Sequence, residues 1–225
     1  VYDFYSETKV GYVDYSGTIW ANEMKRTDQP GRAAVMVQMT AYLQKKYGVL
    51  ALGSLGFENA YAIAMRRTHA DQLHINTLAD LAAHAGSMTI GGDYEIFSRP
   101  EWRAVTAAYG FHFAKQRQYQ SDFLYRAVAS SDVDAITAFS SDGRLAADHL
   151  TVLTDPRPAI PAYDAVILIS PRRADDARLR KALSPLIGAI PVERMREANL
   201  SVDRDADKRS PAQAAEALAK ILGSG

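Results

Sequence analysis

The sequence predicts an α/β protein in which short strands alternate with amphipathic helices. Runs rich in β-branched and aromatic residues recur along the chain, and apolar residues at helical spacing recur between them. The chain has 225 residues, of which 48% are hydrophobic. That length suits one large α/β domain or two small lobes built from one interleaved chain, and the hydrophobic fraction excludes wholesale disorder.

The expected strands are short apolar runs that end next to turn residues. They cover residues 10–15, 49–57, 60–65, 88–90, 134–139, 151–153 and 165–169. The second and third of these look extended, and Gly53 and Gly56 are expected to split this stretch of chain. Because strands alternate with helices, the sequence predicts parallel sheets with helices on their faces.

The expected helices carry start and stop signals. They cover residues 17–26, 33–47, 78–85, 100–109, 122–129, 176–187, 192–199 and 212–222. Gly48 is expected to end the second helix and Gly110 the fourth, which starts at Pro100. Thr77 and Asp80 form the two ends of a predicted capping box, while Ser121 is expected to cap the fifth helix.

Charge and cysteine content exclude several classes of protein. The 26 Lys and Arg residues balance 26 Asp and Glu residues, which leaves no basic surface typical of nucleic-acid binding. No apolar run is long enough for direct membrane insertion of this chain. The absence of cysteine excludes a thiol nucleophile and cysteine-based metal sites, and it is compatible with an oxidising compartment. Because the chain starts at Val1, we expect a mature or trimmed form.

The sequence predicts no catalytic residue, cofactor or metal site. The five histidines show no ligand spacing on one helix face. Gly91 and Gly92, before Asp93, are typical of a tight turn and less often of an anion cradle. Asp93 and Glu95 lack a partner base, so an acid–base pair is not supported.

Three tyrosines lie at the ends of expected strands, beside turn residues. Tyr15 precedes a Ser-Gly-Thr turn, Tyr61 follows Glu-Asn-Ala, and Tyr163 follows Ile-Pro-Ala. Ligands of open α/β sheets bind at strand ends, and several aromatic rings there can surround a small apolar or cationic group. The alternative is that the three tyrosines fill separate parts of the core.

Several ordered segments together resemble the substrate-binding proteins of ABC importers for glycine betaine, choline and carnitine. These segments are 12–18, 57–64, 91–99, 140–144, 153–155, 160–163 and 195–203. They occur in the family's order and at about its spacing across nearly all of the chain. Some members of that family are fused to the permease subunit.

The resemblance implies a type II periplasmic-binding-protein fold, in which two α/β lobes are joined by two crossing strands. Lobe 1 would comprise residues 1–65 and 166–225, and lobe 2 residues 66–165. The crossings would fall near residues 62–67 and 163–167. The family normally has a βαβ segment ahead of the segment 12–18, and we expect it to be missing or altered here.

The resemblance also implies a binding site for a quaternary ammonium ligand between the lobes. In the family, aromatic rings surround the cation, a threonine and an arginine hold the polar end of a carboxylated ligand, and a tyrosine is usual near Phe139. The ligand-binding residues implied here are Tyr15, Thr18, Tyr61, Arg99, Phe139, Ser140 and Tyr163. Because Phe139 has no hydroxyl group, it departs from the family pattern and can alter the polar preference.

The implied function is capture of a quaternary ammonium compound, such as glycine betaine or choline, and its delivery to an ABC permease. The protein would then be periplasmic or otherwise extracytoplasmic, free, membrane-tethered or fused to the permease. The alternatives are a site for ergothioneine or another betaine, and a ligand-sensing domain of a regulator. An enzyme of the porphobilinogen deaminase type shares the fold but needs a cysteine, which this chain lacks.

Overall fold

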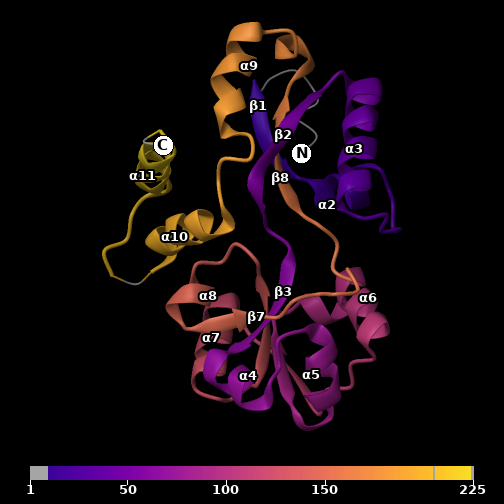
Figure 1. Ribbon diagram of the computed structural model, residues 1–225, viewed down its shortest axis with the longest axis vertical. Helices are drawn as coiled ribbons and strands as arrows, with labels where there is room; N and C mark the ends of the chain where they lie inside the picture. Colours follow the sequence, from indigo (N-terminus) through magenta and orange to yellow (C-terminus); the bar gives the residue numbers. More distant parts are fainter. Residues whose placement is uncertain (1–9, 205, 224–225) are drawn as a thin grey trace. The chain divides into compact units, whose positions relative to one another are not determined.

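The computed structural model describes residues 10–204 and 206–223 (Figure 1). Its residues group into two compact units. Unit 1 contains the described residues up to Asn59, Pro161–Met195, and the described residues after Ala215. Unit 2 contains Ala60–Ile160 and Arg196–Ala215. The side chain of Ser121, the expected helix cap, lies outside the described residues.

Unit 1 contains a three-stranded sheet in the order β1-β8-β2. The strands are β1 (Gly11–Tyr15), β2 (Leu50–Glu58) and β8 (Asp164–Ile169), and all six residues of the central strand β8 are buried. β8 pairs antiparallel with both neighbours, so the prediction of parallel sheets is wrong for this unit. The cause is the path of the chain, which leaves unit 1 after β2 and returns to it along β8, in the direction opposite to β2.

Helices cover both faces of the unit 1 sheet. After β1, the short α2 (Ser16–Thr18) continues as a π-helical segment, Ile19–Glu23. The long helix α3 (Arg32–Tyr47) ends at Gly48, whose φ of 67° confirms the expected stop. Apolar residues of α3 pack on one face of β8, and α9 (Ala177–Leu183) packs with Leu55 and Phe57 on the other.

Unit 2 contains a five-stranded sheet in the order β5-β4-β6-β3-β7. Its strands are β3 (Tyr61–Arg66), β4 (Thr89–Gly92), β5 (Lys115–Gln118), β6 (Ala135–Phe139) and β7 (Leu150–Val152). β4 is parallel to β5 and β6, but β3 is antiparallel to β6 and β7, so this sheet is mixed. The sequence did not predict β5, because its four residues are all polar and exposed.

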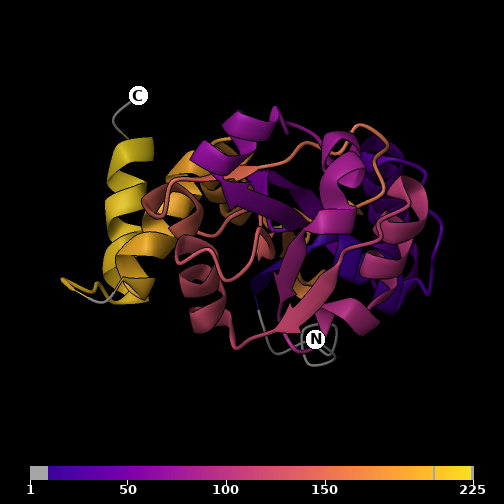
Figure 2. The same cartoon turned by 90° about the horizontal axis from the view of Figure 1, so that it is seen from below.

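The helices of unit 2 lie on both faces of its sheet (Figures 1 and 2). α4 (Arg67–Leu73), α5 (Leu78–His84) and α6 (Pro100–Tyr109) pack on one face, around Met65 and Ile90. α7 (Ser121–Ala129) and α8 (Arg144–Ala147) pack on the other, around Ala64 and Ile136. The capping box of Thr77 and Asp80 at the start of α5 is confirmed.

Each of the two C-terminal helices is divided between the two units. They are α10 (Val192–Asp203) and α11 (Pro211–Leu222). The packing therefore assigns residues 196–215 to unit 2, whereas the division expected from the sequence assigns all of 166–225 to lobe 1. The other two boundaries between the units lie directly after Asn59 and directly after Ile160.

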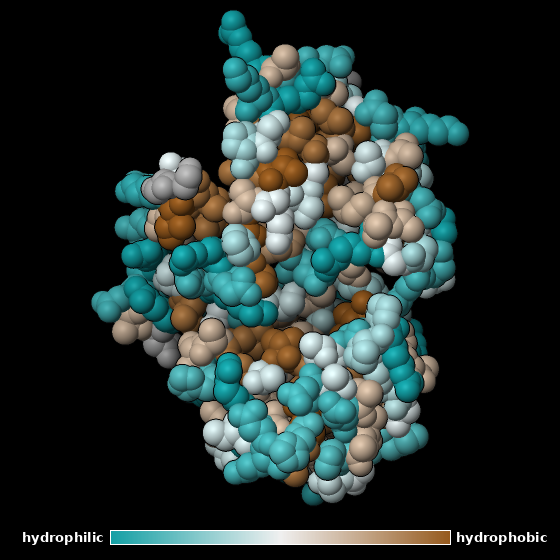
Figure 3. Space-filling model, in the orientation of Figure 1, coloured by the Kyte–Doolittle hydropathy of each residue, from teal (hydrophilic) through white to brown (hydrophobic). Residues whose placement is uncertain are grey.

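Apolar side chains also occur at the surface. On the face drawn in Figure 3, hydrophobic residues are interrupted by hydrophilic ones. Val10, Tyr12 and Val13 are among the exposed large apolar residues, and they lie at or just before the edge strand β1. Within residues 10–204 and 206–223, no helix is long and apolar enough to cross a membrane.

Candidate functional site

Unit 2 brings two of the expected ring residues into contact. Tyr61 opens β3 and Phe139 closes β6, and the two are register partners in the antiparallel ladder. Their ring centroids are 4.8 Å apart, with planes inclined by 34°. Phe139 remains 39% exposed, so this residue is only partly covered by its neighbours. Burial raises the pKa of Tyr61 to about 12, which keeps its hydroxyl protonated at neutral pH.

Arg99 lies beside this ring pair. Its guanidinium carbon is 5.8 Å from the Tyr61 ring centroid, within cation–π range. Nη2 forms an ion pair with Glu95 Oε2 at 2.6 Å, and this hydrogen bond raises the pKa of Arg99. Nε is buried and has no hydrogen-bond partner among the described residues. One edge of the guanidinium is therefore paired with Glu95, while the buried Nε makes no hydrogen bond to any described residue.

The Gly91–Gly92 segment forms the end of β4 and a close turn. A Cβ atom on Gly92 would lie 2.4 Å from Ile96 Cγ2, so only glycine fits there. Asp93 Oδ1 accepts hydrogen bonds from the backbone N–H groups of Glu95 and Ile96, each at 2.8 Å. Asp93 thus organises the turn that leads to Arg99, which accounts for this carboxylate without acid–base chemistry.

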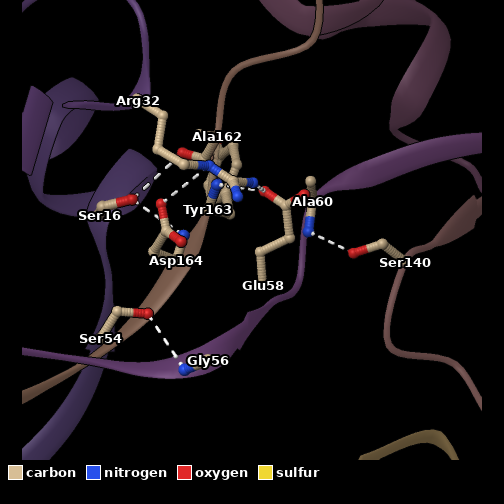
Figure 4. A network of polar contacts seen from close by, with 10 residues as sticks. All are labelled: Ser16, Arg32, Ser54, Gly56, Glu58, Ala60, Ser140, Ala162, Tyr163 and Asp164. Atoms are coloured by element: carbon tan, nitrogen blue, oxygen red, sulfur yellow. Dashed lines mark hydrogen bonds and ion pairs between the residues drawn. The ribbon is translucent and has the colours of Figure 1, made fainter. Parts of the chain in front are cut away.

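Ser140 is held at the end of β6 by two hydrogen bonds with Ala60. Its N–H donates to the Ala60 carbonyl at 2.8 Å, and its Oγ accepts from the Ala60 N–H at 3.0 Å (Figure 4). The Ser140 hydroxyl oxygen therefore already takes part in joining β6 to the start of β3.

A small pocket of about 40 Å³ lies within unit 2 beside these residues. Its lining residues are Tyr61, Asp93, Leu124, Tyr125, Thr137, Ala138, Phe139 and Asp142. A water molecule needs about 10–15 Å³ by a comparable measure, so this hollow alone takes only a few waters. The sequence did not single out Tyr125 or Asp142 as site residues. The Tyr125 hydroxyl donates to Asp142 Oδ2 at 2.6 Å, a contact between distant segments that no local pattern reveals.

Unit 1 places the other expected residues at one end of its sheet. Tyr15 is the last residue of β1, and Tyr163 immediately precedes β8, the strand antiparallel to β1. Both therefore lie at the same end of the sheet, although only Tyr15 is at the carboxyl end of its strand. Thr18 follows, half-buried, at the end of α2.

The backbone around Tyr163 is fixed by neighbouring groups. A Cβ atom on Gly17 would lie 2.8 Å from two ring carbons of Tyr163 and from the Ala162 carbonyl oxygen. Ser16 Oγ donates to that carbonyl at 3.3 Å and accepts from the Asp164 N–H at 2.9 Å. Glycine at position 17 therefore lets the Tyr163 ring lie directly against α2.

An ion-pair network joins α3 to the same end of the sheet (Figure 4). Arg32 contacts Glu58 Oε2 at 2.5 Å and Asp164 Oδ2 at 3.4 Å. Glu58 Oε2 also accepts a hydrogen bond from the Tyr163 N–H at 3.4 Å. Burial raises the pKa of Asp164, and the charge of Arg32 opposes that rise.

The seven expected site residues thus form two groups. Tyr61, Arg99, Phe139 and Ser140 belong to unit 2, whereas Tyr15, Thr18 and Tyr163 belong to unit 1. Within the part of the chain that the structure describes, no group of three or more His, Cys, Asp or Glu side chains is placed to hold a metal ion. The chemistry these groups offer is recognition by ring faces and by hydrogen bonds.

Comparison with known proteins decides the family. Residues 4–220 match OpuAC, the substrate binding domain of the ABC-type glycine betaine transport system. The chain belongs to this family. Its fold is that of the type II periplasmic binding proteins, as the resemblance implied.

Individual relatives are transport proteins. The chain is 29% identical over 217 residues to "Ergothioneine transport permease/ergothioneine binding protein EgtU" of Helicobacter pylori, a match covering 94% of this chain and 38% of that protein. It is 28% identical over 153 residues to "Carnitine transport binding protein OpuCC" of Listeria monocytogenes, covering 67% of this chain and 50% of the relative. The chain thus spans half or less of the length of these curated relatives.

Among solved structures, the chain resembles one described as a glycine betaine/carnitine/choline ABC transporter. The TM-score is 0.86 at 27% sequence identity, and the match covers 94% of this chain and 78% of the other. These relatives and the family itself are described by binding and transport, not by catalysis.

Proposed function

We propose that this protein is the ligand-binding component of an ABC importer and captures a quaternary ammonium compound such as glycine betaine or choline. The ligand would lie in an aromatic cage between two lobes and be delivered to the permease subunit. The observation that supports this proposal best is the Tyr61–Phe139 ring pair with the Arg99 guanidinium beside it.

Ring faces suit this class of ligand for a physical reason. A trimethylammonium group has no N–H to donate, and its charge is spread over methyl groups. It therefore interacts with the negative faces of aromatic rings, each contributing about 0.5–2 kcal/mol. Tyr15 and Tyr163 would supply further rings from unit 1, with Thr18 of the same unit. Ser140, next to Phe139, would complete the wall from lobe 2.

Arg99 would hold the carboxylate of a betaine. A guanidinium can form two parallel hydrogen bonds with a carboxylate, and the Nε of Arg99 is a buried donor without a partner among the described residues. The ion pair with Glu95 is the competing role for this side chain. Exposed pairs of this kind are weak, so a ligand carboxylate can displace Glu95.

The proposal extends to location and movement. Importers of this family capture ligand outside the cytoplasm, so we place the protein there, free, tethered or fused to a permease. We retain residues 1–65 with 166–225, and 66–165, as lobes that close on the ligand. The ligand would bias the closed state because it contacts residues of both lobes.

Ergothioneine is the second candidate ligand. It is a betaine with a thioimidazole ring, and the relative whose name states ergothioneine transport matches 94% of this chain. The same cage and arginine would hold its trimethylammonium and carboxylate groups.

A thermal-shift panel tests the proposal. Glycine betaine, choline, carnitine, proline betaine and ergothioneine are compared, with glycine as a control that lacks the trimethylammonium group. A ligand at 100 times its Kd stabilises the folded state by about 2.7 kcal/mol. At least one quaternary ammonium compound should raise the unfolding temperature while glycine does not. If none does so at millimolar concentration, the proposed function is wrong.

A further inference from the structure

The segment 195–203 carries part of the family resemblance, yet the proposed cage gives it no role. It forms most of α10. Two of its side chains donate hydrogen bonds to the turn that follows β6. Arg196 Nε donates to the Ser140 carbonyl at 2.7 Å, and Asn199 Nδ2 donates to the Ser141 carbonyl at 2.9 Å. All of these residues belong to unit 2.

The turn and α10 are also in direct backbone contact. A Cβ atom on Gly143 would lie 2.4 Å from the Arg196 carbonyl oxygen and 2.5 Å from Leu200 Cβ. The φ of Gly143 is −68°, which any residue adopts, so glycine is needed here for close approach rather than for backbone conformation. Any side chain at this position would separate the turn from the helix.

The opposite side of the turn is bonded to the start of β3. Ser140 forms two hydrogen bonds with Ala60, as described above. Within the turn itself, the Asp142 N–H donates to the Phe139 carbonyl at 3.0 Å. The turn is thus held between β3 and α10. Phe139, which precedes it, is 39% exposed, so burial alone does not fix its ring.

We propose that Arg196 and Asn199 are positioning residues for the ligand site: their two hydrogen bonds hold the turn 140–143 so that Phe139 presents its ring beside Tyr61. This inference rests on the proposed function for its consequence on binding. The two donors satisfy successive carbonyl groups, and two bonds fix both the position and the direction of a short backbone segment.

Hydrogen exchange on the ligand-free protein tests the positioning step without any ligand. The variants are Arg196→Met, which keeps an apolar stem, and Asn199→Ala. In each variant, the amide hydrogens of the peptide covering 137–145 should exchange faster. The reason is that the turn is held less firmly, so the hydrogen bonds of the Ser140 and Asp142 N–H groups open more often. Arg196→Lys keeps a donor and should restore part of the protection. Arg178→Met, an exposed position on α9, is the matched control and should leave this peptide unchanged. Unchanged exchange in both test variants would overturn the proposal.

Titration with glycine betaine, or with the strongest ligand of the panel, tests the consequence for binding. At a temperature well below unfolding, each test variant should bind about two- to tenfold more weakly, the range of one hydrogen bond. In a Phe139→Leu background, the effect of Arg196→Met should shrink, because the positioned ring is gone. A wild-type Kd with faster exchange would show that the contacts serve stability alone, and would overturn the positioning role. If the wild type binds no quaternary ammonium compound, the proposed function fails, while the exchange result still decides whether α10 holds the turn.

Discussion

The ring of Tyr61 lies against the ring of Phe139, with the centroids 4.8 Å apart. The pair arises from strand register: the first residue of β3 is the partner of the last residue of β6. Residues 78 positions apart in the sequence therefore form one aromatic surface where two interior strands of the sheet begin and end. Such a surface offers adjoining π systems to a cation.

Replacing either ring by leucine should weaken binding of quaternary ammonium ligands. Tyr61→Leu and Phe139→Leu keep an apolar surface but remove the π face. Each should cost about 1–2 kcal/mol, or about five- to thirtyfold in Kd by titration calorimetry. Tyr61→Phe should cost much less. Phe123→Leu removes another exposed ring of unit 2 and serves as the control. Equal effects at positions 61, 139 and 123 would argue against a specific ring surface.

Arg99 should discriminate between ligands with and without a carboxylate. Arg99→Ala should weaken glycine betaine by about 1.5–3 kcal/mol, the range for a hydrogen bond to a charged group, and choline much less. Glu95→Gln removes the exposed ion pair but keeps the guanidinium, and it should not reproduce this loss. Calorimetry with both ligands on both variants measures the difference. Equal losses for the two ligands in Arg99→Ala would contradict a carboxylate clamp.

Gly17 should tolerate no side chain. In Gly17→Ala, the new Cβ would lie 2.8 Å from the Tyr163 ring and from the Ala162 carbonyl, so backbone or ring must move. Overpacking of this kind typically costs about 1–3 kcal/mol of unfolding free energy. Gly86→Ala is the matched control, because no atom lies within 4 Å of its added Cβ. Urea unfolding compares the two variants, and equal stability of both would refute the close contact.

Asp14 should make stability depend on pH. Burial raises the pKa of its carboxyl group above the ordinary value of 3.8, although the Tyr15 N–H donates to it at 2.7 Å. A raised folded-state pKa means that the folded protein holds this proton more tightly than the unfolded chain does. The unfolding free energy that this group contributes therefore falls as pH rises from about 3.8 to the raised pKa.

Asp14→Asn should remove that dependence, because an amide oxygen can accept the same hydrogen bond without ionising. The stability of the variant relative to the wild type should increase with pH across that window and then level off. Urea unfolding at a series of pH values between about 3 and 7 measures it. A stability difference that stays constant over the series would show that Asp14 does not titrate as described.

Local signals in the sequence predict most of the elements. The Thr77 capping box and the stop at Gly48 are confirmed, because each depends on a few neighbouring residues. Strand direction is not local. The expected parallel sheets gave way to an antiparallel sheet in unit 1 and a mixed sheet in unit 2, since the direction of β8 and β3 depends on how the chain passes between the units.

The candidate site shows the same limit. Family resemblance identified Tyr61, Phe139 and Arg99, and the structure brings these three together within unit 2. The Tyr125–Asp142 hydrogen bond and the contacts of Arg196 with the Ser140 turn were not predicted. They join segments 17 and 56 residues apart, and neither a spacing nor a motif reports such a pairing.

On the proposed function, aromatic rings of this protein recognise the positive charge of a quaternary ammonium group. Titration calorimetry with two matched pairs of ligands tests it most directly: glycine betaine against tert-butylacetate, and choline against its neutral carbon analogue. Each pair has the same shape, but carbon replaces the charged nitrogen. Recognition by ring faces predicts that the charged member binds at least about tenfold more tightly, as expected from two or more cation–π contacts. Equal affinity within each pair would mean that shape and burial alone select the ligand, and would contradict the claim.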